Sequence, residues 1–148
     1  MDPIRLATCT YQEFAPHMGT PVRTTAGHPR FSLRYQLGGH ARLITPTREL
    51  LKINAEDAYE FSYRRLLNGN GLENIRRELA TIAAASGSDG PLVLLCFDRF
   101  DKLRPPNAWC HRSQFSRWWT EQTGEEVPEL GAKPMSAQTP PPPTLFDV

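Results

Sequence analysis

Five side chains suited to chemistry follow one another closely in the second half of the chain: Cys96, Asp98, Cys110, His111 and Arg112. A cysteine thiolate is a nucleophile and a soft metal ligand, and a histidine exchanges a proton near neutral pH. The guanidinium of arginine binds phosphate or carboxylate through two parallel hydrogen bonds. These residue types predict an anion-binding site in which the adjacent cysteine and histidine react while the other three side chains hold the ligand.

Several chemistries compete for these residues. Neighbouring positions on a helix point about 100° apart, which makes a direct nucleophile and base pair of Cys110 and His111 awkward. A cysteine-phosphatase loop would need its arginine one position earlier than Arg117. A zinc site could draw on both cysteines and His111, with Cys9 as a fourth ligand, but no paired spacing supports it. We therefore expect no metal and no cofactor. It stays open whether the cysteines are only small buried hydrophobes.

Two predicted elements must bring these residues together. Leu92–Phe97 is a continuous apolar run, which is typical of a central strand in a parallel sheet. Cys96 and Asp98 come at its carboxyl end, where open α/β sheets bind their ligands. A polar loop leads to an amphipathic helix that begins near Cys110 and ends at Gly124. The helix face expected to pack on the sheet carries Phe115, Trp118, Trp119 and Gln122.

The start of this helix adds chemistry of its own, because its first N–H groups are unpaired and the positive end of its dipole lies there. An anion is favoured at such a position, and a cysteine thiolate is stabilised. The helical rotation turns His111 inward and places Cys110 and Arg112 on opposite flanks. We therefore expect an anion-binding site beside Arg112, and a Cys110 thiol that is more reactive than the thiol of a free cysteine.

Upstream segments supply the rest of the fold. Ile4–Thr10 is expected to be the first strand, and Thr20–Arg34 is an irregular, arginine-rich segment whose Arg23 should join the anion site. An anion site of this kind requires that one pocket brings together the side chains of Cys9, Arg23, Cys96, Cys110 and His111. Helices are predicted from Thr45, from Asn54 to the Asn68–Gly71 turn and from Leu72 to about Ala85. The apolar side of the middle helix is expected to carry Ala58, Phe61 and Leu66, and Tyr63 is a further candidate for it.

The length of 148 residues suits one domain of ordinary size. Helices followed by a fully buried strand predict an α/β fold, with a mainly parallel sheet and flanking helices in a single compact domain over residues 1–130. Residues 131–148 contain four consecutive prolines and are expected to form a disordered tail.

Composition excludes several classes of protein. The formal net charge of +1 argues against a bulk electrostatic nucleic-acid binder. No apolar run approaches the length of about 18 residues that a membrane span needs, and the N-terminus does not resemble a secretory signal. Three cysteines, an odd number without framework spacing, fit a reducing compartment. The chain is therefore predicted to be cytoplasmic.

A family resemblance rests on the same stretch. LVLLCFD followed by WCHRSQFSRWW resembles the core of the prokaryotic and phage family called domain of unknown function family 488. Its members have an apolar strand that ends in cysteine, and then Cys-His-Arg at a helix start. Cys96, Cys110, His111 and Arg112 match this pattern.

The resemblance extends to the segment before this stretch, where two residues differ from the family pattern. PVRTTAGHPRF is similar to a strand-end Asp-x-Arg segment of the family, in which Arg23 matches the arginine but Pro21 replaces the aspartate. Asp98 stands where the family often has glutamate. The resemblance spans residues 4–127, is strongest over 92–119, and implies a compact α/β fold without an established activity.

Two functions follow as hypotheses. In the first, the domain binds a phosphorylated ligand, a nucleotide or a nucleic-acid end, at the Cys-His-Arg helix start, with thiol chemistry at Cys110. In the second, it is a non-catalytic interaction module whose Leu145-Phe146 tail docks on a protein partner such as a DNA sliding clamp. Whether the chain is an enzyme stays open at this point.

Overall fold

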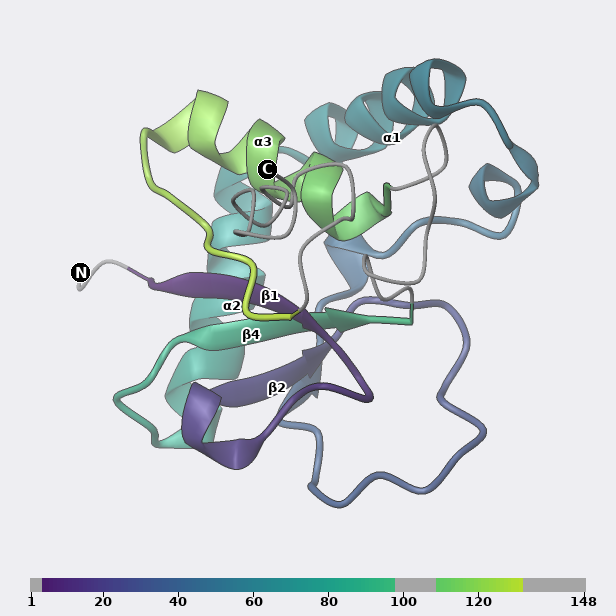
Figure 1. Ribbon diagram of the computed structural model, residues 1–148. Coiled ribbons are helices and arrows are strands. Elements are labelled where there is room, and N and C mark those ends of the chain that lie inside the picture. Colours follow the sequence, from purple (N-terminus) through teal and green to yellow (C-terminus); the bar gives the residue numbers. More distant parts are fainter. Residues whose placement is uncertain (1–3, 98–108, 132–148) are drawn as a thin grey trace, which may run out of the picture.

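A sheet of four short parallel strands lies at the centre of the computed structural model, which describes residues 4–97 and 109–131 (Figure 1). The strands are β1 (Leu6–Thr10), β2 (Thr20–Arg23), β3 (Gly39–His40) and β4 (Leu92–Cys96). Their order across the sheet is β1-β4-β2-β3, so β4 is hydrogen-bonded on both sides. The predicted central parallel strand is confirmed.

The described residues also form three α-helices: α1 (Glu56–Asn70), α2 (Leu72–Ser86) and α3 (His111–Thr123). Short 3-10 turns occur at η1 (Pro16–Met18), η2 (Arg42–Ile44) and η3 (Leu50–Lys52). These elements make a single compact α/β domain, as the sequence predicted.

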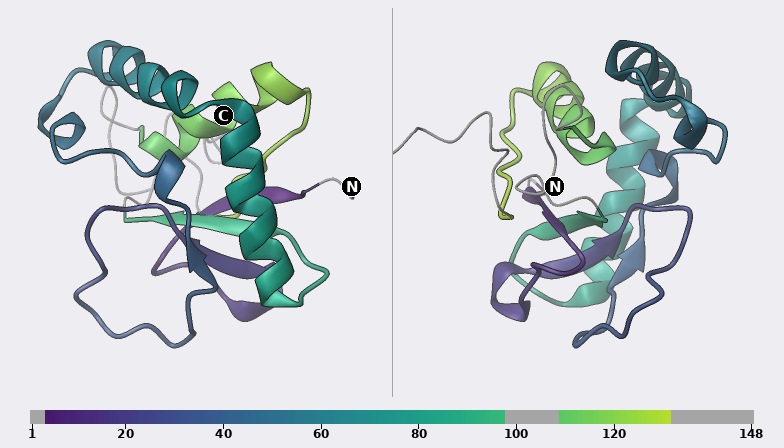
Figure 2. Two further views of the ribbon diagram at one scale, coloured as in Figure 1. Left: turned by 180° about the vertical axis from the view of Figure 1, so that it is seen from behind. Right: turned by 45° about the vertical axis from the view of Figure 1, so that its right-hand side comes forward.

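The two faces of the sheet are covered differently. Successive strand residues point to opposite faces, and two separate hydrophobic clusters result. Leu6 and Leu94 belong to the cluster that contains the buried residues of all three helices. Cys9 and Val93 belong to the other cluster, which is completed by residues of connecting segments such as Tyr35. The helices therefore gather on one face of the sheet (Figure 2).

Helix α2 buries its expected face, whereas α1 buries Tyr63 of its expected face but not Phe61. Ile75, Leu79 and Ile82 of α2 are buried. In α1 the buried residues are Tyr59, Tyr63 and Leu67, whereas Phe61 is 65% exposed. The expected burial of Phe61 is wrong because Tyr63 can be buried with its polar end satisfied: its hydroxyl donates to the Ile44 carbonyl at 2.5 Å.

The helix predicted from Thr45 is also absent from the described structure. Thr45 follows η2, and its hydroxyl donates to the carbonyl of Ala41 at 2.8 Å. A side chain that bonds back to the preceding turn closes a helix rather than opening one. The segment that follows reaches α1 through the short turn η3.

The carboxyl ends of the parallel strands lie at one edge of the sheet. Thr10 of β1 pairs with Cys96 of β4, and Arg23 of β2 pairs with Leu95. Helix α3 contacts both β1 and β4. The fold therefore places the end of β4, the end of β2 and the α3 helix close together, at the edge where the sequence predicts a site.

Among residues 4–97 and 109–131, every helix is too short or too polar to cross a membrane. Asp98 and residues 132–148, which hold nearly all of the predicted tail, lie outside the described residues.

Candidate functional site

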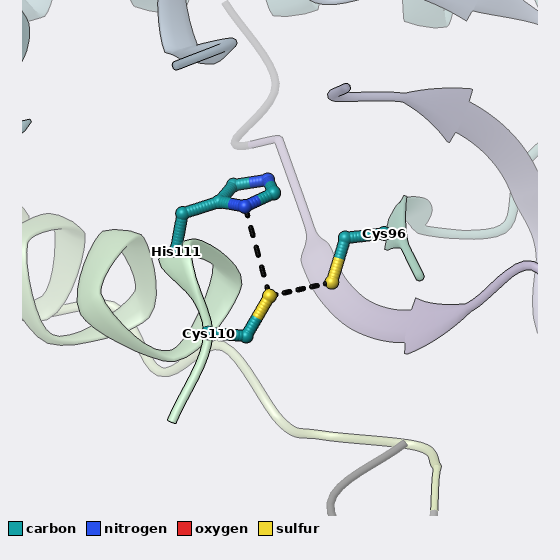
Figure 3. A group of neighbouring side chains, drawn as sticks. All are labelled: Cys96, Cys110 and His111. Carbon is teal, nitrogen blue, oxygen red and sulfur yellow. Dashed lines mark hydrogen bonds between the residues drawn. The ribbon is translucent and has the colours of Figure 1, made fainter. Parts of the chain in front are cut away.

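Two cysteines meet where β4 ends and α3 begins. The Sγ atoms of Cys96 and Cys110 are 2.7 Å apart, and both side chains are buried and form no disulfide (Figure 3). This distance is longer than the S–S bond of about 2.05 Å in a disulfide. The two sulfurs are therefore farther apart than a bonded pair, and closer than two unbonded sulfurs ordinarily approach.

Cys110 precedes the helix instead of belonging to it. It is the N-cap residue of α3, with extended backbone angles of φ −151° and ψ 160°. Its Sγ consequently lies 3.6 Å from Nδ1 of His111, and the two side chains point toward each other (Figure 3). The predicted divergence of Cys110 and His111 is wrong, because the helical rotation does not apply to a residue outside the helix.

The other ring nitrogen of His111 is held by Thr24, which directly follows β2. Nε2 of His111 lies 3.1 Å from the Thr24 hydroxyl, and that hydroxyl donates its only proton to the Leu95 carbonyl at 2.7 Å. Thr24 must therefore accept a hydrogen from Nε2 of His111. In the neutral imidazole, Nδ1 is then left unprotonated and faces the Cys110 thiol.

Arg112 contacts the cysteine pair through Cys96. Its side chain is buried; Nη1 donates to Sγ of Cys96 at 2.6 Å, and Nε donates to Glu129 at 2.8 Å. Glu129 also accepts a hydrogen bond from Thr8 of β1. Arg112 thus contacts the sulfur pair while a carboxylate beyond β1 balances its charge.

These contacts favour a Cys110 thiolate. Burial by itself raises the pKa of a thiol, because it disfavours the charged form. The hydrogen bond with Cys96, the charge and hydrogen bond of His111, and the charge of Arg112 outweigh burial and hold the pKa of Cys110 well below its usual value. The positive end of α3 acts in the same direction. This direction agrees with the reactive Cys110 thiol expected from the sequence, and the reactivity itself stays a prediction.

Cys9 and Arg23 lie apart from this group. Cys9 packs on the opposite face of the sheet, against Val93 and Leu95, and burial raises its pKa to about 11. The guanidinium of Arg23 donates to the carbonyls of Thr25 and Ala26 at 2.8 and 2.5 Å. The expected convergence therefore holds for Cys96, Cys110 and His111 but not for Cys9, and Arg23 supports a neighbouring loop.

A small cavity of about 140 Å³ adjoins the cysteines. The described residues that line it are Thr25, Ala26, Gly27, Pro46, Leu51, Cys96, Phe97, Cys110 and His111. The Arg23 side chain stabilises part of this lining, because its guanidinium donates hydrogen bonds to the carbonyls of Thr25 and Ala26. A larger hollow of about 600 Å³ lies at the opposite end of β1, beside Leu6 and Pro128, and no cysteine lines it.

The two cysteines and His111 are residue types that bind metal ions. One ligand atom from each of Cys96, Cys110 and His111 lies within 4.8 Å of the others. Zinc binds thiolate sulfur at about 2.3 Å in tetrahedral geometry, which separates two sulfurs by about 3.8 Å. The observed 2.7 Å is shorter. The two sulfurs would therefore have to move apart for both to bind one zinc ion.

Thr24 and Glu129 were not identified by sequence reasoning. Thr24 lies in the arginine-rich segment that had been singled out, directly after the predicted Arg23, so its position at a strand end was a usable signal. Glu129 lies at the end of the domain, and only the bridge that pairs it with Thr8 brings it to the site. No local pattern of residues marks such a contact.

The chain was compared with protein-family models, with curated proteins and with solved structures, and none of the three comparisons finds a match.

Proposed function

We propose that this chain is a cysteine-dependent enzyme in which Cys110 attacks a small electrophile in the adjoining cavity. The observation that carries the proposal is a pair of hydrogen bonds made by His111. Its Nδ1 contacts Sγ of Cys110, and its Nε2 contacts the hydroxyl of Thr24. A nucleophile, a base and a third group that orients the base form the usual arrangement of nucleophilic enzymes.

Each group has a distinct part in the proposed chemistry. Nδ1 of His111 takes the proton of Cys110, and the resulting imidazolium pairs with the thiolate. Thr24 keeps the ring in the tautomer that leaves Nδ1 able to accept this proton. The imidazolium can later return the proton to the leaving group. Burial of both cysteines keeps the attacking sulfur largely free of water.

The phosphorylated ligand of the sequence-based hypothesis stays a prediction, with weaker support than thiol chemistry. Arg112 donates to Cys96 and Glu129, and Arg23 donates to loop carbonyls. Neither guanidinium lines the cavity. The anion best placed at the start of α3 is the Cys110 thiolate itself.

The proposal is tested by the pH dependence of alkylation. The full chain is treated with chloroacetamide between pH 5 and 9, and each cysteine is mapped by mass spectrometry. Cys110 should react at pH 7 at close to its maximal rate, His111→Gln should slow it, and Cys9 should react only after unfolding. A rate at Cys110 that rises only near the ordinary thiol pKa of about 8.5 would contradict the proposal.

The same assay tests the ligand class. Inorganic phosphate and a nucleoside triphosphate are added in separate series before alkylation. Protection of Cys110 by either compound supports a phosphorylated ligand. Unchanged alkylation at millimolar concentrations of both counts against it.

We also propose membership of domain of unknown function family 488, on the strength of Cys96, Cys110, His111 and Arg112. Support comes from the way these four side chains contact one another in a continuous chain. An alignment of homologues in which the four positions vary independently would count against this membership.

The non-catalytic alternative concerns the Leu145-Phe146 tail, which lies outside the described residues. A chain that lacks Pro140–Val148 should then lose its protein partner and keep its fold. Binding that persists in the shortened chain would remove this alternative.

A further inference from the structure

We propose that Cys96 is the resolving thiol of the site, and that the electrophile is a small hydroperoxide. The inference rests on the proposed nucleophile Cys110 and adds both the substrate class and the fate of the intermediate. It starts from the contact between two sulfurs that belong to different elements, the end of β4 and the N-cap of α3.

The neighbouring thiol limits what kind of adduct Cys110 can usefully carry. Any group added to Cys110 Sγ is formed within reach of Cys96 Sγ, 2.7 Å away. A thiol resolves an oxidised sulfur, either a sulfenic acid or a mixed disulfide, by forming an S–S bond. An acyl adduct would merely be passed from one cysteine to the other. The pair therefore favours a two-electron oxidation.

A peroxide would form the sulfenic acid and a disulfide would form the mixed disulfide. The size of the site decides between these two oxidants. Cys96 is 1% exposed and Cys110 is 4% exposed, and the cavity beside them measures about 140 Å³. Sulfurs buried to this extent, beside a cavity of this size, favour a compact oxidant over a protein disulfide or a peptide disulfide such as oxidised glutathione. Hydrogen peroxide or a short alkyl hydroperoxide is the class of oxidant that fits.

The first step transfers one oxygen atom. The Cys110 thiolate attacks the terminal oxygen of the hydroperoxide, an S–O bond forms and the O–O bond breaks. The leaving alkoxide, or hydroxide from hydrogen peroxide, takes the proton held by His111. Cys110 becomes a sulfenic acid, and an alcohol or water is released.

In the second step the Cys96 sulfur attacks the Cys110 sulfur. The S–S bond forms, the S–O bond breaks, and the departing hydroxide combines with the Cys96 proton to give water. Arg112, which donates to Cys96 Sγ, stabilises negative charge as that proton leaves. An external dithiol must then supply two electrons by thiol–disulfide exchange to restore both thiols.

The experiment treats the full chain with one equivalent of hydrogen peroxide at pH 7. The wild type should lose about 2 Da, the mass of two hydrogens, and the disulfide should map to Cys96 and Cys110. Cys96→Ser should instead accumulate a Cys110 sulfenic acid that dimedone traps. Cys110→Ser should react at least about 30-fold more slowly with peroxide, because even a free thiol is only about 3% ionised at pH 7 and the two remaining cysteines are buried.

Cys9→Ser is the matched control and should behave as the wild type. Cys96→Ala repeats the trapping experiment if the serine variant folds poorly. Rapid alkylation of Cys110 without a peroxide product would overturn the substrate class and leave the proposed nucleophile intact. Oxidation by oxidised glutathione but not by peroxide would also overturn it. Slow, unselective alkylation would instead remove the proposed function.

Discussion

The hydroxyl of Thr24 determines which nitrogen of His111 carries the proton, and this gives a test at the scale of one atom. Thr24→Val removes the acceptor for Nε2–H and the bond to the Leu95 carbonyl. A hydrogen bond of this kind is worth about 1 kcal/mol, so alkylation of Cys110 at pH 7 should slow about five- to tenfold. Thr24→Ser keeps the hydroxyl and should keep the rate.

Rate and stability must be separated in this comparison. Thermal unfolding of both Thr24 variants shows whether the core is intact. If the valine variant is as stable as the serine variant and alkylates equally fast, Thr24 does not orient His111.

The lowered pKa of Cys110 also predicts how stability depends on pH. Above the ordinary thiol pKa of about 8.5, the folded chain gains the full benefit of its stabilised thiolate. As pH falls toward the lowered folded-state pKa, the unfolded chain binds a proton that the folded chain does not, so this benefit is lost. The free energy of unfolding of the wild type should therefore rise, relative to Cys110→Ser, between pH 6 and 9.

Urea denaturation of the two proteins across this range measures that difference. Cys9 provides a contrast, because burial raises its pKa to about 11 and its contribution is lost only above the ordinary thiol pKa. A constant or falling difference between the wild type and Cys110→Ser would contradict a thiolate in the folded state.

At the scale of elements, α3 carries a polar side chain where its packing calls for an apolar one. The Gln114 side chain is fully buried, and its amide finds no hydrogen-bond partner among the described residues. An unsatisfied buried amide costs about 1 to 3 kcal/mol. Gln114→Met has a similar size and should raise the free energy of unfolding by roughly 1 kcal/mol or more.

Gln122 offers a matched control on the same helix. It was expected on the packed face but is exposed, so Gln122→Met should change stability by less than about 0.5 kcal/mol. Denaturant titration compares the two variants. A loss of stability in Gln114→Met would show that this amide has a binding partner in the native protein.

At the scale of the whole molecule, the fold was more predictable than the site. The unbroken apolar run of β4 and the apolar spacing in α2 are local patterns, and the structure has both elements where they were expected. The face on which Cys9 lies depends on its register in β1, which composition does not reveal. The contact of Cys110 with His111 depended on a shift of the helix start by one residue.

The contacts that the sequence could not reveal join distant segments. Thr24 and His111 are 87 positions apart, and Arg112 reaches Glu129 across a bridge at the edge of β1. Such pairs are set by how the sheet and α3 pack, not by any motif. Sequence reasoning therefore named the cysteines and the histidine that meet at this site, but not the groups that hold them in place.

The spacing of the two sulfurs along the chain has a consequence for the folded lifetime of the molecule. Cys96 and Cys110 are 14 positions apart, so a bond between them would close a loop of about that length. Closing a loop of about 15 residues restricts the unfolded chain by about 3 kcal/mol. The oxidised protein should therefore unfold at a temperature roughly 10 °C higher than the reduced protein.

Calorimetry of oxidised and reduced wild type measures this shift, and Cys96→Ser should show none. An unchanged or lower unfolding temperature after oxidation would contradict the expectation. An oxidised chain would then resist proteolysis until a reductant reduces the disulfide. The lifetime of the protein would therefore depend on whether it has been exposed to an oxidant.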